Sequence, residues 1–153
     1  MAELKALADT ETGGPPDDYV LEDQVGHLLR RAHQRATAIF LDRIGDSGLT
    51  PPQFAALVKL RDMGEVSQNH LGRLTAMDPA TNQGVIRRLS AKGLIRGAPD
   101  RADRRRALWR LTEEGAALVA TLVDAAKAVS DHTLGPLSSA ERRDFLAMLR
   151  RLT

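Results

Sequence analysis

Apolar residues recur at intervals of three and four positions in six segments of this chain, which is the spacing of amphipathic helices. In the first segment the stripe includes Leu29, Ala32, Ala36 and Phe40. The pattern predicts helices over residues 18–44, 51–63, 67–74, 79–92, 112–131 and 138–152. Within the second helix, Leu57, Leu60 and Met63 are expected to face the core.

Helix-starting residues stand at the ends of these segments. Asp78 is followed by Pro79, which places a capping carboxylate directly before a proline at the first helical position. Ser138, with Glu141 three residues later, has the spacing of a capping box. Side-chain caps are expected at Thr50, Ser67, Asp78, Thr112 and Ser138.

The middle of the chain predicts a helix-turn-helix followed by a β-hairpin. The helices at 67–74 and 79–92 are joined by a short turn, and a third helix precedes them. Directly afterwards, "LIRGA" at 94–98 and "ALWRLT" at 107–112 predict two short strands around the arginine-rich tip "PDRADRRR". A hairpin in this position is a wing.

The predicted fold is mainly α with a small β-hairpin wing. We expect a disordered tail over 1–17 and one domain over 18–153, in which a winged helix-turn-helix at 50–112 is flanked by dimerisation helices at 18–46 and 113–153. The flanking helices carry more apolar surface than one small domain can cover. Pairing with an identical chain is therefore expected, and a two-fold dimer matches a palindromic DNA site.

Charge is distributed unevenly along the 153 residues. Residues 84–110 hold nine Lys or Arg against two Asp, whereas the rest of the chain holds thirteen basic against eighteen acidic residues. A cationic region on an otherwise acidic protein is typical of a surface that binds a polyanion. The alternative at this stage is a solvated basic face that has no partner.

Several classes of protein are disfavoured by the composition. Cysteine is absent, which excludes disulfides, thiolate metal sites and thiol-based peroxide sensing. No apolar run is long enough to predict a membrane span, and the first residues do not resemble a secretory signal, so a cytoplasmic protein without a membrane partner is expected. Glycine-rich phosphate loops and nucleophile elbows are also missing, and an enzyme is not expected.

The residues resemble the multiple-antibiotic-resistance (MarR) family of winged-helix transcription regulators. The resemblance covers about 18–152 and is carried by "DPATNQGVIRRLSAKGLI" as recognition helix and first strand, and by "DRADRRRALWRLTEEG" as wing and following helix. It implies that Arg105 enters the minor groove of DNA, steered by Asp103, while Arg104 and Arg106 contact phosphates. Where many members have an arginine, this chain has Gly84, which either reduces direct base reading or lets the helix approach the groove more closely.

The same resemblance places Thr81 and Gln83 at base edges and Arg87 and Arg88 near the DNA backbone. The alternative for the first two is that they are ordinary solvent-facing helix residues. Ser67 is expected to cap its helix and, together with Gln68 and Asn69, is a candidate phosphate contact through free backbone N–H groups.

Most regulators of this type are repressors that a small molecule releases from DNA. The segments "YVLEDQVGHLLRRAHQRATAIF" and "LTPPQFAAL" resemble the branch that controls breakdown of aromatic acids, such as hydroxycinnamates as coenzyme A thioesters or hydroxypyridines derived from nicotinate. A carboxylate ligand needs a cation on a half-buried wall, and the candidates are Arg30, His33 and His70. For the histidines the alternative is a packed, hydrogen-bonded role.

No cofactor is expected, and the four histidines do not have the spacing of a metal site. The sequence thus predicts a homodimeric, sequence-specific regulator of double-stranded DNA that responds to a small molecule. A ligand-independent architectural DNA-binding protein is the alternative function.

Overall fold

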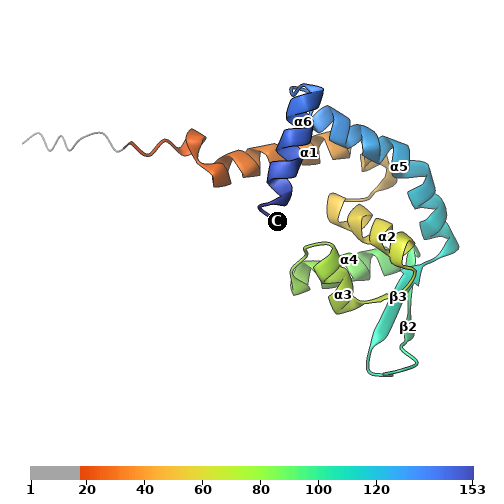
Figure 1. The fold of residues 1–153 in the computed structure, drawn as a ribbon. Helices are drawn as coiled ribbons and strands as arrows, with labels where there is room; N and C mark the ends of the chain where they lie inside the picture. The colour runs from red at the N-terminus through yellow and green to blue at the C-terminus, as the bar shows by residue number, and fades with distance from the viewer. Residues whose placement is uncertain (1–17) are drawn as a thin grey trace, which may run out of the picture.

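The structure is a computed structural model that describes residues 18–153, so the tail expected over 1–17 lies outside the described residues. Figure 1 shows a winged module at one end of the molecule and a group of long helices at the other. The helices of the described part are α1 (Val25–Ile44), α2 (Pro51–Met63), α3 (Gln68–Leu74), α4 (Pro79–Ala91), α5 (Glu113–Thr133) and α6 (Ser139–Arg150), with short 3-10 helices η1 (Leu21–Asp23) and η2 (Gly45–Ser47).

All six predicted helices are present, and the expected caps form. The side chains of Ser67, Asp78, Thr112 and Ser138 each accept a hydrogen bond from a backbone N–H in the first turn of their helix. The first helix begins later than predicted, because the backbone of Gln24 is extended (ψ 130°) and separates η1 from α1.

The strands β1 (Val66–Ser67), β2 (Ile95–Pro99) and β3 (Ala107–Leu111) form an antiparallel sheet in the order β1-β3-β2. The hairpin has the expected position, with Ile95 opposite Leu111 and Pro99 opposite Ala107. The pairing of β1 with β3 was not predicted, since two residues are too short for an alternating pattern to be recognised.

The core lies inside the winged module. It consists of aliphatic side chains from α2, α3, α4, β2 and the start of α5, and Leu57, Leu71 and Leu89 are completely buried. Val119 of α5 is also completely buried in this cluster, so the first turns of α5 pack with the winged module.

The prediction that Met63 faces this core was wrong, because its side chain is 49% exposed. Met63 is the last residue of α2, and the chain turns sharply at Gly64, which adopts a positive φ of 79°. Val66, only 3% exposed, then occupies the core instead.

The junction between the wing and α5 is built tightly around Thr112. Its Oγ1 donates to the Gly93 carbonyl at 2.6 Å and accepts the N–H of Gly115 at 3.1 Å, while its own N–H donates to the Leu94 carbonyl at 3.1 Å. A Cβ at position 115 would lie 2.0 Å from the carbonyl oxygen of Leu94. Glycine is therefore required there, which explains the glycine that ends the segment "DRADRRRALWRLTEEG".

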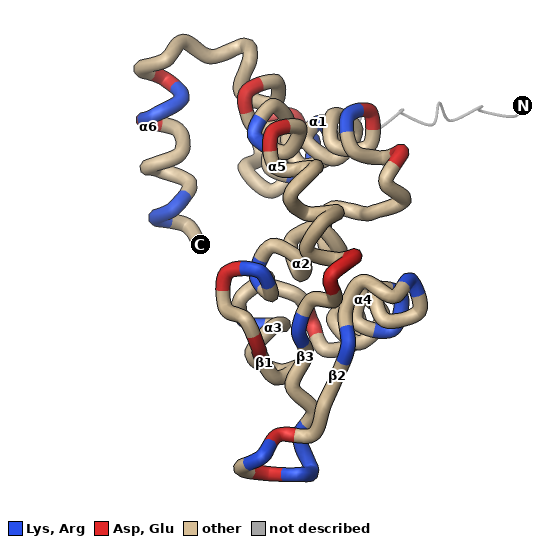
Figure 2. The backbone as a smooth tube through the Cα atoms, turned by 90° about the vertical axis from the view of Figure 1, so that its right-hand side faces the viewer, with Lys and Arg blue, Asp and Glu red and all other residues tan. Residues whose placement is uncertain are grey.

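At the other end of the molecule, α1 packs along the C-terminal half of α5. The Arg35 guanidinium donates to the carbonyls of His132 and Thr133 at 3.1 and 3.3 Å, which satisfies carbonyls at the end of α5. The helix α6 stands apart from the winged module (Figure 2), and none of its residues is buried. Over residues 18–153, no helix is long and apolar enough to cross a membrane.

Candidate nucleic-acid interface and apolar groove

The helix α4, which is the predicted recognition helix, begins with a strong cap that uses one of the predicted base-reading residues. Asp78 Oδ1 accepts the backbone N–H of Thr81 at 2.9 Å, and Asp78 Oδ2 accepts the Thr81 hydroxyl at 2.6 Å. These hydrogen bonds, of which the one from the hydroxyl has the largest effect, hold the pKa of Asp78 below its ordinary value. The Thr81 hydroxyl proton is thus committed to the cap, which leaves its oxygen lone pairs and its methyl group for DNA.

The other residues predicted to contact DNA from α4 are also exposed. Thr81, Gln83, Arg87 and Arg88 all face solvent, whereas Val85, Ile86 and Leu89 face the core. At Gly84 a Cβ would meet only Arg88 Nη1, at an ordinary distance of 3.7 Å. Packing within the chain therefore does not require a glycine at this position.

Both aspartates of the wing fold its tip. Asp100 Oδ1 accepts the N–H of Ala102 at 2.9 Å, and Asp103 Oδ1 accepts the backbone N–H of Arg105 at 3.0 Å. The backbone N–H of Asp100 donates to the Arg106 carbonyl at 2.8 Å, which closes the loop. The resemblance implied that Asp103 steers the side chain of Arg105; in the structure it orders the backbone that carries this side chain.

The arginines of the wing tip project into solvent. Arg104, Arg105 and Arg106 are exposed, and Figure 2 shows the basic and acidic positions alternating around the outermost loop. Because the aspartates are engaged by backbone N–H groups, the arginines form the outer surface. Further down the hairpin, Arg110 Nη1 pairs with Glu65 Oε1 at 3.1 Å, which connects β3 to the residue before β1.

The start of α3 and the wing tip meet at a polar hollow of about 490 Å³. The hollow is lined by Ser67, Gln68, Asn69, Arg73, Arg105, Arg106 and Ala107. It therefore joins two predicted phosphate-contacting segments that are more than thirty residues apart in sequence. Arg73 was not among the predicted residues, although it lies four positions after Asn69 and hence on the same face of α3.

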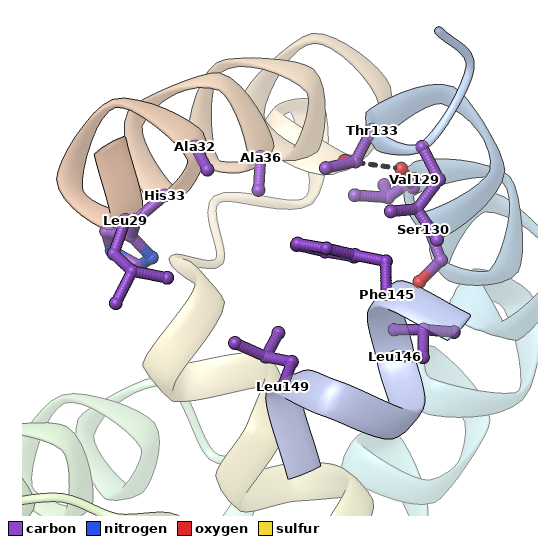
Figure 3. Close-up of a pocket in the computed structure, with 11 residues that line it drawn as sticks. Leu29, Ala32, His33, Ala36, Val129, Ser130, Thr133, Phe145, Leu146 and Leu149 are labelled. Carbon is purple, nitrogen blue, oxygen red and sulfur yellow. Dashed lines mark hydrogen bonds between the residues drawn. The ribbon is translucent and has the colours of Figure 1, made fainter. Parts of the chain in front are cut away.

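A second, apolar groove lies between the long helices (Figure 3) and has a volume of about 410 Å³. Its lining consists of Leu29, Ala32, His33, Ala36, Val129, Ser130, Thr133, Leu134, Phe145, Leu146 and Leu149. The ring of Phe145 projects from α6 into the space beside α1. The Thr133 hydroxyl donates to the Val129 carbonyl at 2.8 Å, so His33 and Ser130 are the polar side chains available to a ligand.

Of the three predicted effector residues, only His33 lines this groove. Arg30 lies one turn earlier on α1, where its Nη2 is 3.2 Å from His27 Nδ1. His70 is on α3 in the winged module, remote in the fold from α6. Within the described range 18–153, no cluster of three or more His, Cys, Asp or Glu side chains could hold a metal ion.

Comparison with known proteins gives a consistent result. The MarR family model matches residues 47–106, which is the winged module up to the residue before β3. The HTH-type transcriptional repressor NicR of Pseudomonas putida is 43% identical over 145 residues, which cover 94% of this chain and 92% of NicR.

Two solved structures are similar over nearly the whole fold. Bordetella bronchiseptica BpsR, described in connection with regulation of its DNA binding by 6-hydroxynicotinic acid, is 46% identical with a TM-score of 0.85, over 89% of this chain and 97% of BpsR. The regulator PcaV of Streptomyces coelicolor, in complex with its natural ligand, is 29% identical with a TM-score of 0.82, over 89% of this chain and 96% of PcaV.

These similarities extend through the wing, the recognition helix and the long flanking helices together. A relative such as NicR, matched almost end to end at this identity, shares the family as well as the fold. This protein belongs to the MarR family of transcription regulators, and it is a regulator and not an enzyme.

Proposed function

We propose that this protein is a homodimeric repressor that binds a palindromic operator and is released from it by a small aromatic acid. The observation that carries the DNA-binding part is the polar hollow, because it brings the start of α3 and the arginines of the wing to one surface next to α4. Such a surface contacts phosphates on both sides of a major groove while α4 reads bases within it. A cytoplasmic location follows from this proposal.

The proposed dimer rests on the exposed apolar faces of α1 and α6. Val25 and Leu28 on α1, Met148 on α6, and Leu152 just beyond the end of α6 are between 50% and 71% exposed. They border an apolar groove of about 320 Å³ that continues the groove around Phe145. A second copy of the chain is the proposed occupant of this outer groove, since the same faces on both chains would cover each other across a two-fold axis.

The proposed effector site is the inner part, around His33 and Ser130. A volume of about 410 Å³ is typical of pockets for small ligands and suits one aromatic ring with its substituents. Of the two ligand types expected from the sequence, this volume favours a free acid such as a hydroxypyridine carboxylate, because a coenzyme A thioester is far larger. The imidazole of His33 would bind the carboxylate, and BpsR, with its link to 6-hydroxynicotinic acid, supports the same ligand class.

Operator binding is tested by selecting duplexes from a random library with the purified protein. We expect enrichment of a palindrome with half-sites about 10 bp apart. Arg105→Ala should weaken binding of the selected duplex at least about tenfold and reduce its salt dependence by about one counterion. Arg143→Ala on α6 removes the same charge far from the wing and should leave binding unchanged. Selection of no common sequence would instead support an architectural role.

Effector release is tested by titrating the protein–duplex complex with 6-hydroxynicotinate and with a coenzyme A thioester of a hydroxycinnamate. We expect the free acid to release the duplex from the wild type and to have a much weaker effect on His33→Leu. Release by neither compound would remove the aromatic-acid part of the proposal and leave the DNA-binding part intact.

Sedimentation of the wild type and of Leu149→Glu tests the dimer, which only the wild type should form.

A further inference from the structure

Two polar side chains are buried in the described part of the chain, Gln53 and Asn82, with exposed fractions of 4% and 3%. The burial of Gln53 is explained by its place at the start of α2, because its Oε1 accepts the N–H of Thr50 at 3.2 Å in a capping box. Asn82 lies beyond the cap of α4, in a position where an apolar residue would continue the core stripe of that helix. Its burial therefore needs another explanation.

The amide of Asn82 connects the two helices of the helix-turn-helix. Its Nδ2 donates to the carbonyl of Gln68, the first residue of α3, at 2.7 Å. Its Oδ1 is buried as well and has no hydrogen-bond partner in residues 18–153. The side chain thus gains one inter-helix bond and leaves one acceptor unsatisfied, which is unfavourable for folding.

The surface of α3 is shaped to receive this amide. A Cβ at Gly72 would lie 3.0 Å from Asn82 Nδ2 and 3.4 Å from Asn82 Cγ. Gly72 is buried, and it lies one helical turn after Gln68. The absence of a side chain at 72 therefore gives the amide its place against α3.

The contact between Asn82 and α3 is open on the side that faces the turn between α3 and α4. A hollow of about 530 Å³, lined by residues of both helices that include Arg73, Pro79 and Asn82, borders the crossing of α3 and α4. Because this side is not tightly packed, packing there does not fix the distance between α3 and α4. The Asn82 hydrogen bond is the directional contact available to do so.

We propose that Asn82 is a positioning residue for sequence readout. Its bond to Gln68 sets the rotation and distance of α4 relative to α3, so that Thr81 and Gln83 reach base edges while the start of α3 contacts the phosphates. An apolar residue of the same size would pack without an unsatisfied oxygen, but it would allow α4 to rotate or slide. The inference rests on the proposed DNA-binding function.

The test compares binding of the selected duplex and of a scrambled duplex by fluorescence anisotropy at several salt concentrations, together with thermal unfolding. For Asn82→Leu we expect a melting temperature equal to or above that of the wild type. The affinity and salt dependence on scrambled duplex should be unchanged, and the preference for the selected duplex should fall at least tenfold. A merely structural role would lower both affinities in parallel with stability.

Gly72→Ala provides a second variant, since it displaces the amide without removing it, and the same loss of preference is expected. If Asn82→Leu does not fold, Gly72→Ala decides the question. Thr75→Val is the matched control: it removes the 2.6 Å hydrogen bond from Thr75 Oγ1 to the Leu71 carbonyl, which stays within the end of α3, and should retain the wild-type preference. An unchanged preference in the folded variants would overturn the inference alone, whereas a wild type without any preference would overturn the proposed function too.

Discussion

The carboxylate of Asp103 accepts the backbone N–H of Arg105, two residues further along the wing, at 3.0 Å. An acidic residue at the tip of a surface that should bind DNA is unfavourable electrostatically. Its hydrogen bond, however, orders the turn that presents the arginine. The two effects can be separated because an asparagine keeps the accepting oxygen and lacks the charge.

We predict opposite results for two substitutions of Asp103. Asp103→Asn should raise affinity for the selected duplex by about threefold at low salt, since one repulsive charge is lost. Asp103→Ala loses the same charge but also the hydrogen bond, and its affinity should fall below that of the wild type. Anisotropy titrations of both variants check this, and equal gains for both would show that the turn is unimportant.

Gly84→Ala should separate stability from binding. A Cβ fits at this position, and alanine is favoured over glycine inside a helix by about 1 kcal/mol, so the free energy of unfolding should increase. If the glycine allows α4 to lie close to the groove, the added methyl group should lower affinity for the selected duplex. Urea unfolding and anisotropy measure the two effects, and unchanged affinity would exclude close approach at Gly84.

Gly115→Ala should destabilise the protein by about 3 kcal/mol, because the new Cβ would overlap the Leu94 carbonyl and force the wing away from α5. The matched control is Gly26→Ala, where the new Cβ has no neighbour within 4 Å and the helix should become slightly more stable. Thermal unfolding of both variants measures the difference. A wild-type melting temperature for Gly115→Ala would contradict the description of this junction.

The cap of α4 predicts a defined pH dependence. The pKa of Asp78 is held below its ordinary value of 3.8, chiefly by the Thr81 hydroxyl and the Thr81 N–H. A carboxylate whose pKa is lower in the folded protein stabilises it above the unfolded-state pKa, and this contribution disappears as the pH falls through the folded-state pKa. The cap should therefore contribute constantly between about pH 5 and pH 8 and weaken only in more acidic solution.

Two variants of Asp78 test this assignment by thermal unfolding across pH. Asp78→Ala should melt a few degrees below the wild type at neutral pH, and the difference should shrink below pH 3.8. Asp78→Asn caps the helix without a titrating group. The difference in melting temperature between Asp78→Asn and Asp78→Ala should therefore not shrink in acid. A difference between wild type and Asp78→Ala that persists unchanged in acid would contradict the charged cap.

The helices and the wing were predictable because their signals are local. Asp78 with Pro79, and Ser138 with Glu141, specify helix starts through bonds within four residues, and the structure contains both. The two residues of β1 carry no such local signal, since their strand is defined by its partner, Trp109 and Leu108 of β3.

The residues of the candidate sites also differ in whether a local signal or the packing of distant segments determines their position. Exposure of Gln83 and Arg105 follows from periodicity and from the hairpin tip. That Arg73 lies beside the wing, and that His33 but not Arg30 lines the groove, depends on how distant segments pack together. The hydrogen bond from the backbone N–H of Arg105 to Asp103 was not predicted either, because the sequence does not distinguish a carboxylate that binds a guanidinium from one that binds a backbone N–H.

One long helix has a mechanical consequence. The 21 residues of α5 run without interruption from the wing junction at Thr112 to the groove wall at Thr133, a length of about 30 Å. Such a rod acts as a lever arm: a tilt of about 5° at the end that lines the groove displaces the far end by about 2.5 Å. In the proposed dimer, a ligand no larger than a single ring would therefore alter the separation of the two wings by more than its own contacts move.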